Sequence, residues 1–159
     1  MIKTTCIGAY PKPGFVALPD WFTTSAGTDT SDPTKWWADA MAAMGDDAED
    51  IISKGVAEVL ADQERAGIDI PTDGEVPREK HIHSHSRHHD AIAFPNLTDK
   101  TLRNGAYVAR LPTIWQPVRA KGSFLAHDWR RAQKLTRRQV KITMPGPMTL
   151  GDTTADVYY

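Results

Sequence analysis

Three short apolar segments of this chain each end in a turn that contains proline or glycine. They are residues 4–9 (TTCIGA), 68–71 (IDIP) and 141–145 (KITMP). The first is predicted as a buried strand that ends at residues 10–14, and helical patterns separate the three. The order strand–helix–strand–helix–strand is typical of an α/β fold with parallel strands, in which polar turns follow the strand ends.

The helix over residues 46–66 has the clearest periodicity in the chain, and Gly67 supplies its C-cap. The side chains at helical spacing are Ile52, Val56, Val59 and Gln63. An earlier helix is predicted to start with Asp32 as N-cap and Pro33 in its first position, and to break near Gly45.

The other segments have weaker patterns. Residues 76–92 are polar and histidine-rich and are predicted to be helical. Residues 93–126 form an irregular excursion, for which a hairpin is one option. Asp128 is the predicted N-cap of a helix that ends near Thr136. From Met148 a further helix is expected to continue to the end of the chain.

Composition indicates one globular domain over residues 1–159. The chain is 40% hydrophobic and 25% charged, with a net charge of -1. This near-neutral balance favours neither nucleic acid nor an anionic membrane surface. No apolar run is long enough to span a bilayer, and the first residues lack the apolar core of a signal peptide, so we expect a cytoplasmic location.

Two segments could carry chemistry. Residues 72–75 (TDGE) follow a predicted strand, where parallel α/β folds hold ligands, and a carboxylate there can bind an ammonium group or act as a base. The alternative is a solvated turn. Histidines at positions 81, 85, 88 and 89 would share one side of a helix, where two could chelate a divalent ion. Ordinary polar or cleft-lining histidines are the preferred interpretation, and Cys6, the single cysteine, is expected to be a buried thiol.

Four segments in order resemble a known family. They are TTCIGAYPKP, GIDIPTDGEVPRE, NGAYVARLPTI and VKITMPGPMTL. They resemble the catalytic C-terminal barrel of cobalamin-independent methionine synthase and its shorter archaeal-type relatives. The resemblance implies a (β/α)8 TIM barrel, related to uroporphyrinogen decarboxylase, of which this chain matches the first three or so β/α units. It also implies transfer of a methyl group from 5-methyltetrahydrofolate, or another donor, to the zinc-bound sulfur of homocysteine, which gives methionine.

The resemblance implies roles for six substrate-binding residues. The backbone of residues 7–9 would hold the amino-acid part of homocysteine, Glu75 would bind its ammonium group, and two residues would support the Glu75 loop. The six are Ile7, Gly8, Ala9, Asp73, Glu75 and Arg78. The sequence departs from the family pattern where Ala9 replaces a serine and where Thr153 replaces a tryptophan that stacks on the pteridine. The Arg-Cys pair of the family is also absent from residues 107–112.

The family's zinc ligands are a His-x-Cys pair, a glutamate and a second cysteine, all in the second half of the barrel. We therefore assign no metal ligand and no catalytic residue to this chain, place zinc in the complete enzyme, and expect a fragment that is inactive alone. Its ligands would be homocysteine, methionine or a related thiol, and its exposed half-barrel edges could form a homo-oligomer. Two alternatives stay open: a small α/β module that binds an amino acid or anion without catalysis, and a metal-binding protein that uses the histidines.

Overall fold

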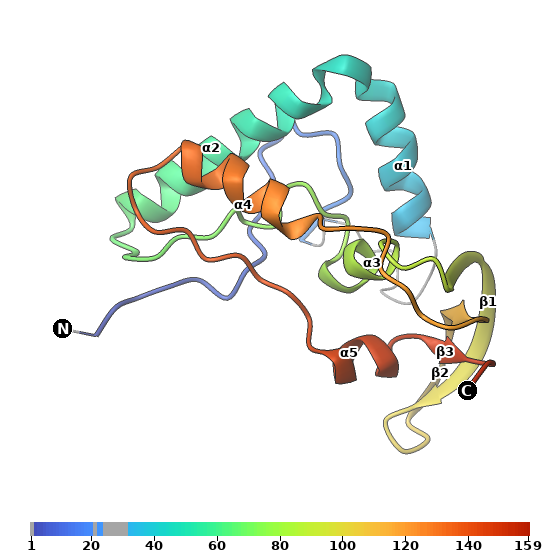
Figure 1. Ribbon diagram of the computed structural model, residues 1–159. Coiled ribbons are helices and arrows are strands. Elements are labelled where there is room, and N and C mark those ends of the chain that lie inside the picture. The colour runs from blue at the N-terminus through green and yellow to red at the C-terminus, as the bar shows by residue number, and fades with distance from the viewer. Residues whose placement is uncertain (1, 21, 24–31) are drawn as a thin grey trace.

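The computed structural model describes residues 2–20, 22–23 and 32–159. The helices are α1 (Asp32–Met44), the 3₁₀ turn η1 (Gly45–Asp47), α2 (Ala48–Arg65), α3 (His81–Ser86), α4 (Leu125–Lys134) and α5 (Pro147–Asp152). The strands are β1 (Ile92–Leu102), β2 (Tyr107–Ile114) and β3 (Ala155–Asp156). In Figure 1, α4 lies beside α2, and the β1–β2 hairpin projects on the side away from the N-terminus.

The three segments predicted as strands run side by side and parallel, in the order first, second, third. Single bridges join Thr5 to Ile70 and Thr72 to Lys141. The amide of Ile70 donates to the carbonyl of Thr4 at 3.0 Å, and that of Lys141 donates to the carbonyl of Pro71 at 2.9 Å. The parallel order is confirmed, but the segments pair at bridges rather than along a ladder, since Pro71 in the middle segment has no N–H to donate.

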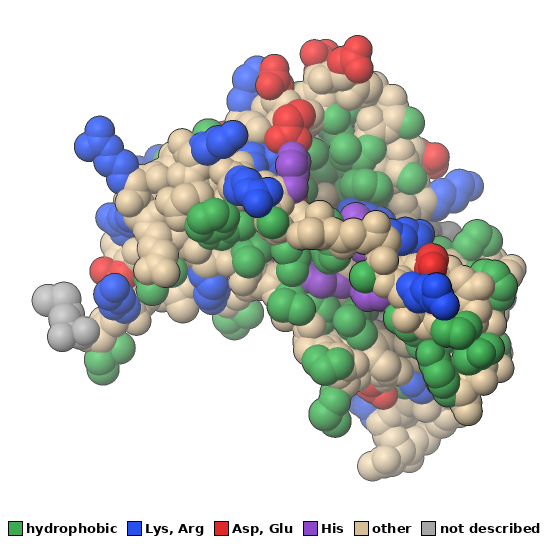
Figure 2. Space-filling view, viewed as in Figure 1, with side chains coloured by type: hydrophobic (Ala, Val, Ile, Leu, Met, Phe, Trp, Pro, Cys, Tyr) green, Lys and Arg blue, Asp and Glu red, His purple; other side chains and the backbone are tan. Residues whose placement is uncertain are grey.

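The prediction that residues 4–9 are buried is wrong. Ile7 is 96% exposed, Cys6 is half-buried, and Gly8 is the one buried residue among residues 4–9. The reason is that this segment borders residues 68–73 on one side, and the described part of the chain places no layer over the rest. Other apolar side chains are exposed on the face in Figure 2, which shows hydrophobic groups around α5 and the hairpin.

Helix α2 supplies the main core and positions the middle segment. Its periodic residues are buried as predicted, with Val56 at 1% and Val59 at 2% exposure, against Val76 at 0%. Each such side chain contributes about 1.5–3 kcal/mol of hydrophobic free energy. The amide of buried Gln63 donates to the carbonyl of Thr72 at 2.9 Å and accepts from its N–H at 2.9 Å, which fastens the middle segment to α2.

Gly74 follows this anchor and has no room for a side chain. Its φ is +67°, and a Cβ there would lie 2.6 Å from Cγ1 of Val59. We expect Gly74→Ala to lower the free energy of unfolding by about 2–4 kcal/mol through overpacking and left-handed strain, measured by urea denaturation. Gly14→Ala, which meets nothing within 4 Å, is the control and should change little. Equal losses in the two variants would contradict this explanation.

The structure confirms some helix boundaries and corrects others. Helix α1 begins at Asp32 and ends before Gly45, as predicted, although residues 24–31 and the side chains of the expected cap lie outside the described residues. Asp128 does not cap α4, which begins at Leu125. Its carboxylate lies in the first turn and accepts a hydrogen bond from Arg131 at 3.1 Å.

The C-terminal segment is not one continuous helix. Helix α5 ends at Asp152, and Ala155 of β3 then pairs in parallel with Thr113 of β2. The ammonium group of Lys100 explains the turn, because it donates to the carbonyls of Gly151, Asp152 and Thr154 at 2.8–3.0 Å. These bonds satisfy carbonyls that the end of a helix leaves free.

The excursion over residues 93–126 does contain a hairpin. Strands β1 and β2 pair antiparallel, and the turn between them has positive φ at Arg103, Asn104 and Gly105. With β3 they form a three-stranded sheet in the order β1–β2–β3. The chain is therefore α/β, but its sheet is built from the hairpin and from β3 rather than from the three predicted strands. In the described part of the chain, no helix is long and apolar enough to cross a bilayer.

Candidate functional site

A cavity of about 400 Å³ opens where the three parallel segments end. A ligand at this position would meet the carboxyl ends of neighbouring strands, as in other parallel α/β folds. The lining includes Ile7, Ala9, Tyr10, Lys12, Phe22, Glu75, Arg78, His81, Thr143 and Met144. The site is thus assembled from residues far apart in the sequence. Its lining combines the carboxylates of Asp20, Glu75 and Glu79 with the cations of Lys12, Arg78 and Lys80 and with apolar groups.

All six predicted site residues gather at this cavity. Ile7, Ala9, Glu75 and Arg78 line it directly, while Gly8 and Asp73 are buried immediately behind the lining. A Cβ on Gly8 would lie 2.5 Å from Oε1 of Glu75, so a side chain at this position would displace the carboxylate oxygen from where it lies against the backbone. The first and second segments therefore meet at this cavity.

The turn over residues 72–75 is held by its own polar groups. The Thr72 hydroxyl donates to the carbonyl of Gly8 at 3.0 Å and accepts from the N–H of Gly74 at 3.1 Å. Oδ1 of Asp73 accepts from the N–H of Glu75 at 3.1 Å. Glu75 has a φ of +56°, a left-handed conformation that costs about 1–3 kcal/mol for a residue with a Cβ. Such strain is typical of functional turns.

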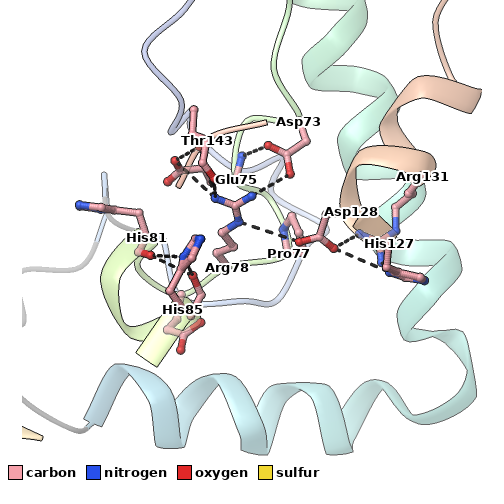
Figure 3. A network of polar contacts seen from close by, with 12 residues as sticks. Asp73, Glu75, Pro77, Arg78, His81, His85, His127, Asp128, Arg131 and Thr143 are labelled. Carbon is pink, nitrogen blue, oxygen red and sulfur yellow. Dashed lines mark hydrogen bonds and ion pairs between the residues drawn. The ribbon is translucent and has the colours of Figure 1, made fainter. Parts of the chain in front are cut away.

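Arg78 lies at the centre of the buried network that Figure 3 shows. Its side chain is 2% exposed and lies 3.7 Å from Asp73 and 3.9 Å from Asp128. Nη1 donates to the carbonyl of Thr143 at 2.9 Å. Burial raises the pKa of the Asp73 carboxyl, and the nearby guanidinium of Arg78 opposes this rise. The arginine thus ties the second segment to the third beneath the cavity floor.

Thr143 fixes the carboxylate of Glu75. Its hydroxyl donates to Oε1 of Glu75 at 2.6 Å, and Nη1 of Arg78 lies 3.8 Å from the same oxygen. Among the residues that the structure describes, Oε2 of Glu75 makes no hydrogen bond, and the residue is 8% exposed. A carboxylate held by one oxygen, with the other toward a cavity, can accept a charge-assisted hydrogen bond from a cationic ligand group.

The histidine side chains of residues 81–89 pack against neighbouring groups and are not arranged as the ligands of a metal ion. Helix α3 has six residues, so the predicted single helical face from His81 to His89 is wrong: the last histidines follow the helix in a turn. His83 and His85 are buried, and Nδ1 of His85 lies 2.7 Å from the carbonyl of His81. Burial lowers the pKa of His83 to about 3 and that of His85 to about 4.

No group of three or more histidine, cysteine, aspartate or glutamate side chains in the described ranges could hold a metal ion. His88 stacks on Phe124 with ring centroids 3.8 Å apart, and His85 meets the same ring edge-on at 5.0 Å. These contacts use the rings for packing, and Cys6 has no second cysteine near it because the chain contains one.

Sequence reasoning missed three residues of this region. Lys12 lies in a segment interpreted only as the end of a strand, although it lines the cavity. Thr143 lies at the end of the third strand segment, the same position relative to a strand that singled out Glu75, and this signal could have found it. Arg131 lies in the helix predicted from Asp128, and its side chain is 8% exposed and donates two 2.8 Å bonds to Glu49.

Comparison with known proteins points to the same family that the four sequence motifs resemble, and it does so over nearly the whole chain. Residues 2–155 match the model of the family described as cobalamin-independent synthase, catalytic domain. The chain is 23% identical to the methionine synthase of Sulfolobus acidocaldarius and 24% identical to that of Saccharolobus solfataricus, covering 100% of this chain and 42% and 43% of those proteins.

Among solved structures, the chain is similar to a B12-independent methionine synthase from a Shewanella species, determined in complex with selenomethionine. The TM-score is 0.76 at 27% identity, over 100% of this chain and 42% of that one. The chain therefore spans less than half the length of the proteins it matches. From its sequence, its fold and the residues around its cavity, this chain belongs to the family of cobalamin-independent synthase catalytic domains.

Proposed function

We propose that this chain forms the amino-acid-binding part of a cobalamin-independent methionine synthase, a methyltransferase that converts homocysteine to methionine. One observation carries the proposal: the backbone of residues 7–9 and the carboxylate of Glu75 meet at one cavity although they come from different parallel segments. The alternative, an amino-acid-binding module without catalysis, uses the same cavity and the same residues.

We further propose that residues 1–159 are one domain, the first three or so β/α units of a TIM barrel. The parallel order of the segments joined at Thr5–Ile70 and Thr72–Lys141 supports this, as does the TM-score of 0.76 to a methionine synthase. In a barrel of this kind the strand ends face one mouth, and the cavity lies at that mouth.

In this proposal Glu75 binds the ammonium group of the amino acid. Thr143 holds Oε1, which leaves Oε2 for the ligand, and Arg78 keeps the third segment in place below. The backbone of residues 7–9 lies against the carboxylate of Glu75 and would contact the α-carbon region. The relative solved with selenomethionine supports this assignment, because selenomethionine carries the same ammonium and carboxylate groups as methionine.

Zinc belongs to the proposed enzyme but not to the described residues of this chain. In the complete enzyme zinc would make the homocysteine thiol a thiolate, the form that attacks the methyl group. The residues described here contain no group that fits the ion, so we derive no step through it. We propose that the isolated chain binds the amino acid without transferring a methyl group from 5-methyltetrahydrofolate or another donor, and zinc-dependent turnover by the purified chain would contradict this.

We expect Glu75→Gln to weaken binding of L-methionine at least about tenfold, because a charge-assisted hydrogen bond contributes about 1.5–3 kcal/mol. Isothermal titration calorimetry measures the effect. Glu58→Gln removes an exposed carboxylate of α2 and is the matched control, which should keep the parental affinity. Unchanged affinity in Glu75→Gln, with circular dichroism that matches the parent, would overturn the assignment of this residue.

A further inference from the structure

Lys12 adds a positive charge to the cavity that Glu75 lines, where the charged side chains of Asp20, Arg78, Glu79 and Lys80 also lie. It follows the first parallel segment, and the chain turns there because the N–H of Lys12 donates to Oδ2 of Asp20 at 3.1 Å. The side chain is half-buried and lines the cavity together with Glu75. A lysine in such a position has lost much of its hydration, which is unfavourable unless an anion compensates.

The other cations of the cavity already have partners. Arg78 donates to Thr143 and faces Asp73, and Lys80 has an interaction of its own. In the ranges that the structure describes, the ammonium group of Lys12 makes no hydrogen bond or ion pair. The ammonium group of Lys12 can therefore form an ion pair with an anionic group of a ligand.

The electrostatics agree with this geometry. Burial lowers the pKa of Lys12, while the carboxylates of Asp20 and Glu75 raise it. The nearby carboxylates thus favour the charged form of Lys12 against the cost of burial. A ligand carboxylate in contact with the ammonium would favour the charged form further.

The cavity lining also contains apolar side chains. Ile7, Phe22 and Met144 line the cavity and are at least half exposed in this chain. The carboxylate of Glu75, the ammonium of Lys12 and the apolar side chains offer a complementary group to each of the three parts of an α-amino acid with an apolar side chain. The volume of about 400 Å³ suits a ligand of that size.

We propose that Lys12 is a specificity-determining residue that binds the α-carboxylate of the amino acid, opposite the ammonium group held by Glu75. The inference rests on the proposed function and adds the group that selects a free carboxylate. Ala9 is consistent with this role, because it offers no hydroxyl to the carboxylate, so the recognition passes to a side chain three residues later. The preferred ligand is then a free amino acid rather than its amide or a residue within a peptide.

The test compares L-methionine with L-methioninamide, which lacks the carboxylate charge, by isothermal titration calorimetry. The parental chain should prefer methionine about tenfold or more. Lys12→Met should remove most of this preference and leave the affinity for the amide nearly unchanged, whereas Lys12→Arg should retain it. Lys54→Met, which removes an exposed lysine of α2, is the matched control and should behave as the parent.

The outcomes separate this inference from the proposed function. If the folded parental chain binds neither ligand, both fail. If it binds methionine through Glu75 but without a preference over the amide, or with a preference that survives Lys12→Met, only the role of Lys12 is overturned. Equal weakening of both ligands in Lys12→Met would also overturn it, because that result indicates a general effect on the cavity.

A carboxylate can also come from the glutamate part of a folate donor. A parallel titration with 5-methyltetrahydrofolate distinguishes this source. We expect Lys12→Met to leave that titration unchanged. Loss of folate binding in Lys12→Met, with the methionine preference intact, would assign Lys12 to the donor and overturn the proposal.

Discussion

Arg78→Met is expected to lower the free energy of unfolding by about 3–5 kcal/mol, because it leaves the buried carboxylate of Asp73 without its cation. The side chains of Arg78 and Asp73 are 2% and 1% exposed. Oδ2 of Asp73 has no hydrogen-bond partner among the described residues, so the guanidinium 3.7 Å away is its main compensation. The variant also loses the bond that Nη1 donates to the carbonyl of Thr143. Urea denaturation followed by tryptophan fluorescence measures the loss.

A double-mutant cycle tests the cause. Asp73→Asn removes the charge that Arg78 compensates, so Arg78→Met should cost markedly less in that background. Arg65→Met breaks an exposed pair with Asp62, whose side chains are 70% and 45% exposed, and should cost less than about 1 kcal/mol. Additive losses from the Arg78 and Asp73 substitutions would show that the ion pair is not the source of the stability.

Acid is expected to destabilise the fold from pH 6.5 downward, a decline that begins about two pH units above the range in which ordinary carboxylates titrate. Burial lowers the pKa of His83 to about 3 and of His85 to about 4, from 6.5. Below pH 6.5 the unfolded chain therefore binds protons that the folded chain does not, and stability falls as pH falls. Each histidine contributes about 1.4 kcal/mol per pH unit, so the pair could remove about 4 kcal/mol by pH 5.

Urea denaturation at pH 7.5, 6.5, 5.5 and 5.0 measures this slope, and His83→Leu should make it shallower. Nδ1 of His83 is buried without a hydrogen-bond partner in the described structure, so the substitution should cost little at pH 7.5. His127→Leu, at a side chain that is 64% exposed, is the matched control and should keep the parental slope. A parental slope in His83→Leu would refute the role of the buried imidazole.

The parts of the fold that local pattern dictates were predictable from the sequence. The spacing of Val56 and Val59 in α2 required a buried face, and the turn at residues 72–75 required a glycine, and both are present. The parallel order of the three segments also follows from helices that separate short apolar runs. These features depend on neighbours within a few residues, where propensity and periodicity decide.

The features of the fold and of the site that local pattern does not predict depend on contacts between residues distant in the sequence. Asp128 has the sequence signature of a cap, yet its carboxylate pairs with Arg131 and faces Arg78. The end of α5 is set by Lys100, which lies about fifty residues earlier. Residues 4–9 have strand composition, but burial also requires a covering layer, which composition does not report. The gathering of Ile7 and Glu75 was reached through family resemblance, since no local pattern brings them together.

The cavity is formed by contacts between residues that are far apart in the sequence. The bond from Thr72 to Gly8 spans 64 residues, and that from Thr143 to Glu75 spans 68. Both close long loops, whose entropic cost must be met before either contact stabilises anything. A site built from such contacts is expected to disappear when either outer segment detaches from the middle one. A bound ligand therefore stabilises the association of all three segments at once.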